Sequence, residues 1–195
     1  MMPLSDVRIG CAMTGSFCTF KAVFEAWRAL KATGAALTPI MSFNASSTNT
    51  RFYTAEEAVS EFAAITGKKP LMTLDAVEPI GPKKLLDALV IAPCTGNTLA
   101  KLAGGIADTP VALAAKSHLR NGRQLVIAVS SNDDLAQNAK NIGQLLAMRN
   151  LYFVPFAQDD PIGKPNSLVA RFEMLSDTVR WALEGRQIQP LLRCS

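Results

Sequence analysis

The sequence lacks any hydrophobic run long enough to cross a membrane, and residues 1–6 lack the charged-then-apolar pattern of a signal peptide. Only 4 cysteines are present and none forms a CxxC pair, so no disulfide framework is predicted. We predict no metal site either. The expectation is a cytoplasmic protein with reduced thiols and no membrane contact.

Runs of like charge are also missing. The net charge is +4, and the basic residues are dispersed without the aromatic residues that are interleaved in a nucleic-acid-binding surface. We therefore expect no nucleic-acid partner. No repeat, linker or low-complexity tract divides the 195 residues, of which 49% are hydrophobic. These features predict a single folded domain over residues 1–195.

Short apolar runs alternate with segments of helical periodicity along the chain. The predicted strands are Val7–Met13, Ala36–Met41, Leu71–Leu74, Leu89–Ala92, Gln124–Val129 and Leu151–Phe156. Because right-handed crossovers place helices over both faces of a parallel sheet, this pattern predicts an α/β fold with a doubly wound parallel sheet. In the commonest six-stranded order the first strand lies beside the fourth, where the winding direction changes.

Sequence signals also place the helices. Phe17–Ala32 carries an aromatic stripe, Thr54 and Glu57 have the spacing of a capping box, and Thr109-Pro110 fits an N-cap followed by a first-turn proline. Two further helices are predicted from apolar spacing: one with Leu135, Ala139, Ile142 and Leu146 on its buried face, and a final one with Leu168, Phe172, Leu175, Val179 and Leu183.

The most informative stretch is Leu89–Thr98, where a buried strand runs into Pro93 and the small residues Cys94–Thr98. Gly96 permits close backbone approach, and a helix follows whose first N–H groups have no partners inside the helix. Such a turn favours binding of an anion. The alternative is an ordinary connection between a strand and a helix.

Two more polar turns follow strands of the same predicted sheet. Thr14-Gly15-Ser16 comes after the first strand and Ser130–Asp133 after the fifth. Because the carboxyl ends of these strands meet at the switch point, the three turns together predict a site for a phosphate-bearing cofactor. A further polar segment, Ser42–Thr50, is interpreted either as a mobile loop or as a substrate lid.

These residues resemble the flavoprotein family that contains cysteine decarboxylases and flavin prenyltransferases. The resemblance covers essentially the whole chain, and its motifs are Arg8–Gly10, Thr14–Thr19, Thr48–Phe52, Ala92–Ala103, Ala114–Arg120 and Val129–Asp133. The Pro93–Thr98 segment corresponds to the family's Pro-Ala-Ser-Ala-Asn-Thr motif, which binds flavin mononucleotide (FMN). Here Cys94, Thr95 and Gly96 replace three residues of that motif.

The resemblance implies a Rossmann-like or flavodoxin-like fold of three layers. It also implies bound FMN near a subunit interface, in a homotrimer or a multiple of trimers. The predicted cofactor-binding residues are Gly15, Ser16, Phe17, Ser42, Cys94, Thr95, Gly96, Asn97, Thr98, Ser131 and Asn132.

Within the family, the chain resembles one component of an oxidoreductase that forms an aromatic pyridine dicarboxylate during sporulation. This implies a net two-electron oxidation of a small dicarboxylate, together with a partner subunit that binds NADP or NAD. The chain itself has no complete dinucleotide fingerprint. Thr48, Asn49 and Arg51 are predicted to bind the substrate, because arginine forms paired hydrogen bonds with a carboxylate; a solvent-facing Arg51 is the alternative.

Two other functions stay open: a flavin-dependent decarboxylase or prenyltransferase, and a non-catalytic scaffold that retained the fold. His118 follows the helix that starts at Pro110, whereas the related decarboxylases carry their catalytic histidine after the second strand. It is interpreted as a helix-end or interface residue, with a general base as the alternative. Cys94 either packs as a small residue or is a thiol activated by the helix N-terminus.

Overall fold

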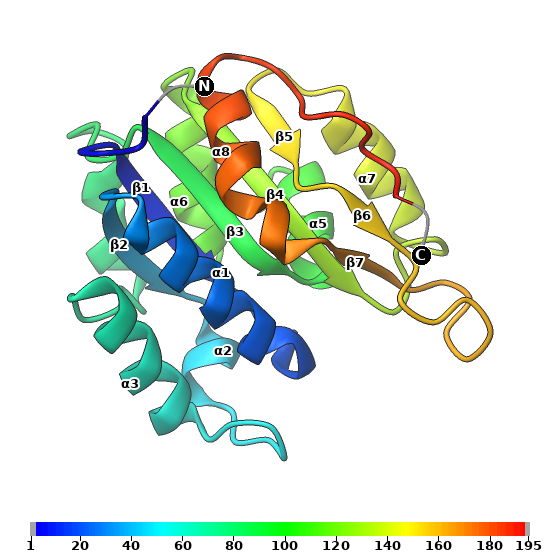
Figure 1. Cartoon of the computed structure of the whole chain (residues 1–195). Coiled ribbons are helices and arrows are strands. Elements are labelled where there is room, and N and C mark those ends of the chain that lie inside the picture. Colours follow the sequence, from blue (N-terminus) through cyan, green and yellow to red (C-terminus); the bar gives the residue numbers. More distant parts are fainter. Residues whose placement is uncertain (1–2, 194–195) are drawn as a thin grey trace.

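The computed structural model describes residues 3–193, which contain a seven-stranded sheet (Figure 1). Its parallel strands lie in the order β2 (Ala36–Met41), β1 (Arg8–Met13), β3 (Ala88–Cys94), β4 (Gln124–Ser131) and β5 (Leu151–Phe153). An antiparallel strand, β7 (Leu168–Ala170), pairs with the carboxyl end of β4, and β6 (Phe156–Ala157) pairs with β7. The α/β class is confirmed, and β1 lies beside β3, the fourth predicted strand.

Helices cover both faces of the sheet (Figure 1). One layer consists of α1 (Phe20–Ala32), α3 (Ala55–Thr66) and α8 (Leu175–Leu183), and the other of α5 (Gly96–Ala103), α6 (Pro110–Arg120) and α7 (Ala139–Leu146). Alternate residues of β3 serve the two hydrophobic cores: Val90 and Ala92 face the first layer, Leu89 and Ile91 the second. No helix among residues 3–193 is long and apolar enough to span a membrane.

Short helical segments complete the fold. They are α2 (Phe43–Ser47), α4 (Leu74–Val77) and three 3-10 turns, η1 (Phe17–Thr19), η2 (Glu78–Ile80) and η3 (Phe172–Met174). The predicted caps are confirmed. The Glu57 carboxylate accepts the Thr54 N–H at 2.8 Å in the capping box of α3, and the Thr109 hydroxyl accepts the Ala112 N–H at 3.3 Å in front of Pro110.

Two predictions of secondary structure are wrong: one strand and the start of the final helix. Leu71–Leu74 is not a strand: Leu71 makes a single bridge to Ile40, and Leu74 already begins α4. The final helix begins at Leu175 rather than Leu168, because Leu168–Ala170 pairs with β4 and β6. Pairing across the sheet thus overrides the helical spacing of that segment.

The predicted buried face of α7 is partly wrong. Leu135, Ala139 and Leu146 are exposed, whereas Ile142 and Leu145 are buried. The helix begins only at Ala139, so Leu135 lies in the preceding turn and has no fixed helical phase with the others. Ile142 and Leu145, three residues apart, instead form the stripe that packs on the sheet.

Candidate functional site

The turns after β1 and β3 are joined by the buried side chain of Thr14. Its hydroxyl donates to the Pro93 carbonyl at 2.7 Å and accepts the Thr95 N–H at 2.9 Å. The backbone N–H of Thr14 donates to the same Pro93 carbonyl at 3.2 Å. A hydroxyl that both donates and accepts satisfies two backbone groups of the neighbouring turn at once. Thr14 therefore fixes the two turns relative to each other.

The turn after β1 is also joined to β4. The hydroxyls of Ser16 and Ser130 lie 2.7 Å apart, and the Ser130 hydroxyl lies 3.5 Å from that of Thr19. Ser130 is the last fully buried residue of β4, so the strand holds this hydroxyl in a defined position. Three strands thereby bring their polar carboxyl ends together, as the sequence predicts.

Thr95 caps α5 and orients its first turn. Its side-chain oxygen accepts the Thr98 N–H at 3.4 Å, and the hydroxyls of Thr95 and Thr98 lie 3.2 Å apart. The remaining N–H groups of the first turn have no intrahelical partners, and together with the helix dipole they favour an anion.

Gly96 is required by its neighbours in the fold. A Cβ at this position would lie 2.3 Å from the Asn138 amide nitrogen and 2.8 Å from both Asp133 Oδ1 and Ser131 Oγ. These polar side chains also bond to one another, since the Asn138 amide donates to Asp133 at 2.9 Å. The glycine thus allows the turn after β4 to pack directly on α5, so the close approach that the sequence predicts is made by this turn.

A cavity of about 330 Å³ opens at this edge of the sheet. Its lining is rich in hydroxyl and amide groups and includes the side-chain ammonium of Lys101, which pairs with Asp108 at 2.7 Å. The residues that line it are Thr14, Gly15, Ser42, Phe43, Asn44, Thr95, Asn97, Thr98, Lys101 and Thr109. The donors and the cation suit a phosphate or a polyhydroxylated chain.

A second cavity, of about 210 Å³, adjoins the first, and Gly15 and Thr95 line both. Its other lining residues are Ser16, Cys18, Thr19, Ser130, Ser131, Asn132, Asp159, Lys164 and Val169. Lys164 and Asp159 come from the segment between β6 and β7 and form an ion pair at 3.2 Å. The site therefore has two compartments with a common wall.

Most of the predicted cofactor residues lie in these cavities. Gly15, Ser42, Thr95, Asn97 and Thr98 line the first, and Ser16, Ser131 and Asn132 line the second. Three others line neither. The Phe17 ring packs against the aromatic core, with its centroid 5.2 Å from that of Phe20. Gly96 is the first residue of α5 and faces the turn after β4, and Cys94 is fully buried in the second core.

Burial raises the pKa of the Cys94 thiol well above its ordinary value. The thiol is thus neutral near pH 7 and lies in the same hydrophobic cluster as Leu99 and Val129. Of the two interpretations of Cys94, the structure supports packing over activation by the helix N-terminus, because a buried apolar environment opposes the thiolate.

The predicted substrate residues line neither cavity. Thr48, Asn49 and Arg51 are exposed, and the Arg51 guanidinium lies over the Phe52 ring at 4.8 Å. The Asn49 side chain accepts the Ala55 N–H at 2.9 Å, which is a local structural bond. The segment predicted as a mobile loop or a lid begins with α2, which Ser42 caps through the Ala45 N–H.

Several cavity residues were not predicted, namely Thr14, Phe43, Asn44, Lys101, Thr109, Cys18, Thr19, Ser130, Asp159, Lys164 and Val169. Thr14 and Ser130 belong to turns that the sequence had singled out, so their positions offered a signal. Lys101 lies one helical turn after Asn97, the spacing that places two side chains on one face. Lys164 had no such signal, because only the antiparallel β6–β7 pairing brings its loop to the site.

The turn after β4 also contains a buried carboxyl group, that of Asp134. Burial, reinforced by the nearby charge of Asp133, raises the pKa of Asp134 to about 7. This group titrates near neutral pH, far above an ordinary aspartate. It makes the carboxyl edge sensitive to pH.

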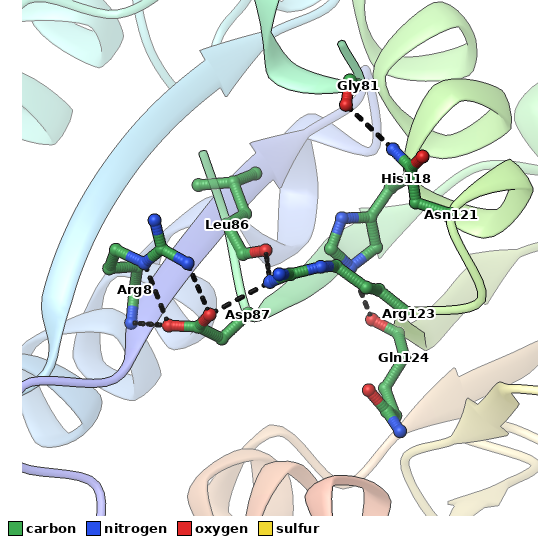
Figure 2. A network of polar contacts seen from close by, with 8 residues as sticks. All are labelled: Arg8, Gly81, Leu86, Asp87, His118, Asn121, Arg123 and Gln124. Carbon is green, nitrogen blue, oxygen red and sulfur yellow. Dashed lines mark hydrogen bonds and ion pairs between the residues drawn. The ribbon is translucent and has the colours of Figure 1, made fainter. Parts of the chain in front are cut away.

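His118 lies at the opposite, amino edge of the sheet (Figure 2). It is 2% exposed, and its Nε2 lies 3.0 Å from the Gln124 carbonyl at the start of β4. Burial lowers the pKa of His118 to about 4, so the ring is neutral and donates to that carbonyl. The structure thus supports a structural helix-end role over that of a general base at the cavities.

The same edge holds a network of ion pairs (Figure 2). Asp87 lies between Arg8, whose Nη2 is 2.6 Å from Oδ1, and Arg123, whose Nη1 is 2.9 Å from the same oxygen. Hydrogen bonds from Arg8 hold the pKa of Asp87 well below its usual range. The network ties the starts of β1, β3 and β4 together on the side away from the cavities.

The structure is that of an α/β protein with polar cavities at the carboxyl edge of its sheet. The chain belongs to the flavoprotein family, because the family model described as Flavoprotein matches residues 2–179. The B subunit of dipicolinate synthase from Bacillus subtilis (strain 168) is 44% identical over 98% of this chain and 96% of the relative. The predicted resemblance is confirmed.

Two solved structures extend this comparison. The B subunit of dipicolinate synthase from Bacillus halodurans C is 41% identical with a TM-score of 0.91, and both chains are covered completely. The FMN-dependent cysteine decarboxylase SpaF is 25% identical with a TM-score of 0.68, over 92% of this chain and 98% of SpaF. The fold is therefore shared with an enzyme that uses FMN.

Proposed function

We propose that the chain is the B subunit of dipicolinate synthase and contributes to the oxidation of dihydrodipicolinate to dipicolinate during sporulation. The observation that carries the proposal is the 44% identity to a protein of that name over 98% of the chain. Its partner is the A subunit of dipicolinate synthase. The polar cavities at the carboxyl edge supply a site of suitable chemistry for the cofactor and a small dicarboxylate.

The first cavity fits FMN by the chemistry of its donors. Ser42 and Thr98 offer hydroxyls, Asn97 an amide, Lys101 an ammonium, and the first turn of α5 free N–H groups. Thr14 and Thr95 orient these donors through their shared hydrogen bonds, and Gly15 lines both cavities. When bound, FMN supplies a centre that takes up two electrons.

The proposed reaction removes two electrons and two protons from the dihydropyridine ring. The electrons finally pass to NADP or NAD held by the partner protein, since this chain has no complete dinucleotide fingerprint. In this scheme the chain's own side chains bind the dicarboxylate beside the cofactor and keep both in a fixed relation.

A decarboxylase or prenyltransferase is the enzymatic alternative, and SpaF is a relative with such an activity. A decarboxylase that depends on a histidine base is disfavoured, because His118, the single histidine of the chain, is buried at the amino edge. A scaffold without flavin is the non-enzymatic alternative. Absorbance in the flavin bands, followed by mass spectrometry of the released ligand, distinguishes the scaffold from both enzymes.

The function is tested by reconstitution with the A subunit, dihydrodipicolinate and a nicotinamide acceptor, measuring dipicolinate while each component is omitted. We expect formation of dipicolinate to require both proteins. Full activity when this chain is omitted would reject the proposed role. Light scattering of the purified chain tests the homo-oligomer, for which we expect a trimer or a multiple of it.

A further inference from the structure

The second cavity contains a cation whose position is fixed by its own loop. Lys164 is the one lysine or arginine among the residues that line this cavity. Its N–H donates to the Asp160 carbonyl at 2.8 Å, and its carbonyl accepts the Ser167 N–H at 3.0 Å. The Gly163 N–H donates to the Asp160 side chain at 2.8 Å, which closes the same turn. The ammonium group therefore extends from an ordered turn.

Two further hydrogen bonds hold this turn, one within the β6–β7 connection and one to another segment. The Gln158 side-chain amide donates to the Pro165 carbonyl at 2.8 Å, and the Leu135 N–H donates to the Asn166 carbonyl at 2.9 Å. The second bond joins the turn to the segment after β4, which begins with Asn132 directly after Ser131, the last residue of the strand. Lys164 is thus held against the wall formed by β4.

The Lys164 side chain pairs with Asp159 at 3.2 Å but is still 49% exposed, so a ligand can reach it. The hydrogen bond to Asp159 raises the pKa of Lys164, so the ammonium is charged at neutral pH. The other polar groups around the cavity are mostly uncharged donors, from Ser16, Ser130, Ser131 and Asn132. An ammonium group that is half exposed, is paired on one side with the Asp159 carboxylate and otherwise faces neutral donors can bind a second carboxylate, that of a ligand.

We propose that Lys164 determines the specificity for a dicarboxylate by binding one ligand carboxylate in the second cavity, while Asp159 holds the ammonium in place and competes with the ligand. The proposal rests on the proposed function, because the dicarboxylate enters the argument from there. In this proposal the group that recognises the carboxylate is Lys164, which lines a cavity, instead of the predicted Thr48, Asn49 and Arg51.

The test is calorimetric titration of FMN-saturated protein with pyridine-2,6-dicarboxylate and, separately, with pyridine-2-carboxylate. We expect the Lys164→Ala variant to bind the dicarboxylate roughly ten- to hundredfold more weakly, which is the loss of one charge-assisted contact. The preference for two carboxylates over one should fall by a similar factor, whereas Lys164→Arg should keep most of it. FMN affinity should be unchanged, which shows that the variants are folded.

Two further variants sharpen the result. Lys21→Ala, an exposed lysine on α1 that lines neither cavity, should change dicarboxylate affinity by less than about twofold. Asp159→Asn should tighten binding, because it removes a competitor and a like charge. An effect opposite in sign to that of Lys164→Ala is not expected from a merely structural role of the pair.

Equal dicarboxylate affinity of wild type and Lys164→Ala would overturn the assignment, and so would a wild-type protein that binds no dicarboxylate. Neither result bears on whether dipicolinate formation needs this chain, which the reconstitution decides. Conversely, a chain that binds the dicarboxylate through Lys164 and proves dispensable in reconstitution would reject the proposed function alone.

Discussion

At the amino edge of the sheet, Asp87 lies between Arg8 and Arg123, and His118 bonds to the start of β4; at the carboxyl edge, hydroxyls and amides surround two open cavities. Both edges are polar, but at the amino edge the charges neutralise one another. The carboxyl edge keeps donors directed into open cavities. Ion pairs also occur at the carboxyl edge, where Lys101 pairs with Asp108 and Lys164 with Asp159. What distinguishes that edge is the set of hydroxyl and amide donors around open cavities, which marks a binding site.

The two edges also respond to pH in opposite directions, and Asp134 gives the largest expected effect. Its pKa is about 7 in the folded protein, against roughly 4 in the unfolded chain, so its stabilising contribution is complete below about pH 4. That contribution is lost as pH rises through about 7. The wild type should lose about 2–3 kcal/mol of unfolding free energy between pH 5 and pH 8 through this group, and Asp134→Asn should not show that loss.

Urea denaturation at the two pH values measures this shift. A pH dependence unchanged by Asp134→Asn would mean that the carboxyl group titrates like an exposed aspartate.

His118 gives the next largest effect, with the opposite sign. Its folded pKa of about 4 lies below an ordinary value near 6.5, so its contribution is complete above about pH 6.5 and is lost as pH falls toward 4. His118→Gln should therefore remove about 2 kcal/mol of the stability lost between pH 8 and pH 5. The same denaturation experiment detects it, and the double variant with Asp134→Asn should show the sum, since the residues lie on opposite edges. A single-variant pH profile that coincides with the wild type contradicts the buried neutral ring.

Thr14→Val tests the bonds between the turns at the carboxyl edge. The valine keeps the shape but leaves the Thr95 N–H without its acceptor and takes one of two donors from the Pro93 carbonyl, which still accepts the backbone N–H of residue 14; the change should cost about 1–2 kcal/mol of unfolding free energy. Because both cavities lose a fixed wall, FMN affinity should fall as well. Thr33→Val on the far side, where the hydroxyl bonds only to the Leu30 carbonyl, is the matched control and should leave FMN binding unchanged. Full FMN affinity in Thr14→Val would show that the turns need no such tie.

Asp87→Asn tests the amino edge. Removing the carboxylate from between two guanidinium groups should cost about 1 kcal/mol, a modest value because the network is partly exposed to solvent. Since the pKa of Asp87 is held well below its usual range, this cost should be complete above about pH 4 and should decrease progressively as pH falls from there toward the lower folded pKa. A cost that stays constant from pH 7 to pH 3, measured by denaturation, would contradict the ionic origin.

The smallest effect is expected for Arg51→Ala. The side chain is exposed and lines neither cavity, so stability should change by less than about 0.5 kcal/mol, and dicarboxylate affinity should not change. Calorimetry measures the affinity. A loss of tenfold or more, which corresponds to about 1.4 kcal/mol of binding free energy, would restore Arg51 as a substrate residue.

The order of β1, β3 and β4 and the convergence of their turns were predictable, because strand periodicity and short polar turns are local signals. The side of the sheet on which the Cys94 side chain lies was not predictable. The ladder between β3 and β4 shifts register between Ile91 and Cys94, so Cys94 joins Leu89 and Ile91 on the α5 side rather than following the alternation. That shift depends on pairing with β4 and leaves no trace in the spacing of apolar residues.

The second cavity shows the same limit. Lys164 and Asp159 reach it because β7 pairs antiparallel with β4, and the helical spacing of Leu168 and Phe172 concealed that strand. Contacts between segments far apart in the chain decide such placements, whereas caps such as Thr54 and Thr109 depend on residues three positions away and were confirmed.

The central claim is that the carboxyl edge, and not the amino edge, binds FMN. The direct measurement is the quenching of FMN fluorescence on titration with the wild type, with Ser16→Leu/Asn97→Leu, and with Asp87→Asn. We expect saturable quenching by the wild type and by Asp87→Asn with equal affinity, and affinity lowered at least roughly a hundredfold in the double variant, whose leucines fill both cavities. Equal affinity of the double variant and the wild type would contradict the claim.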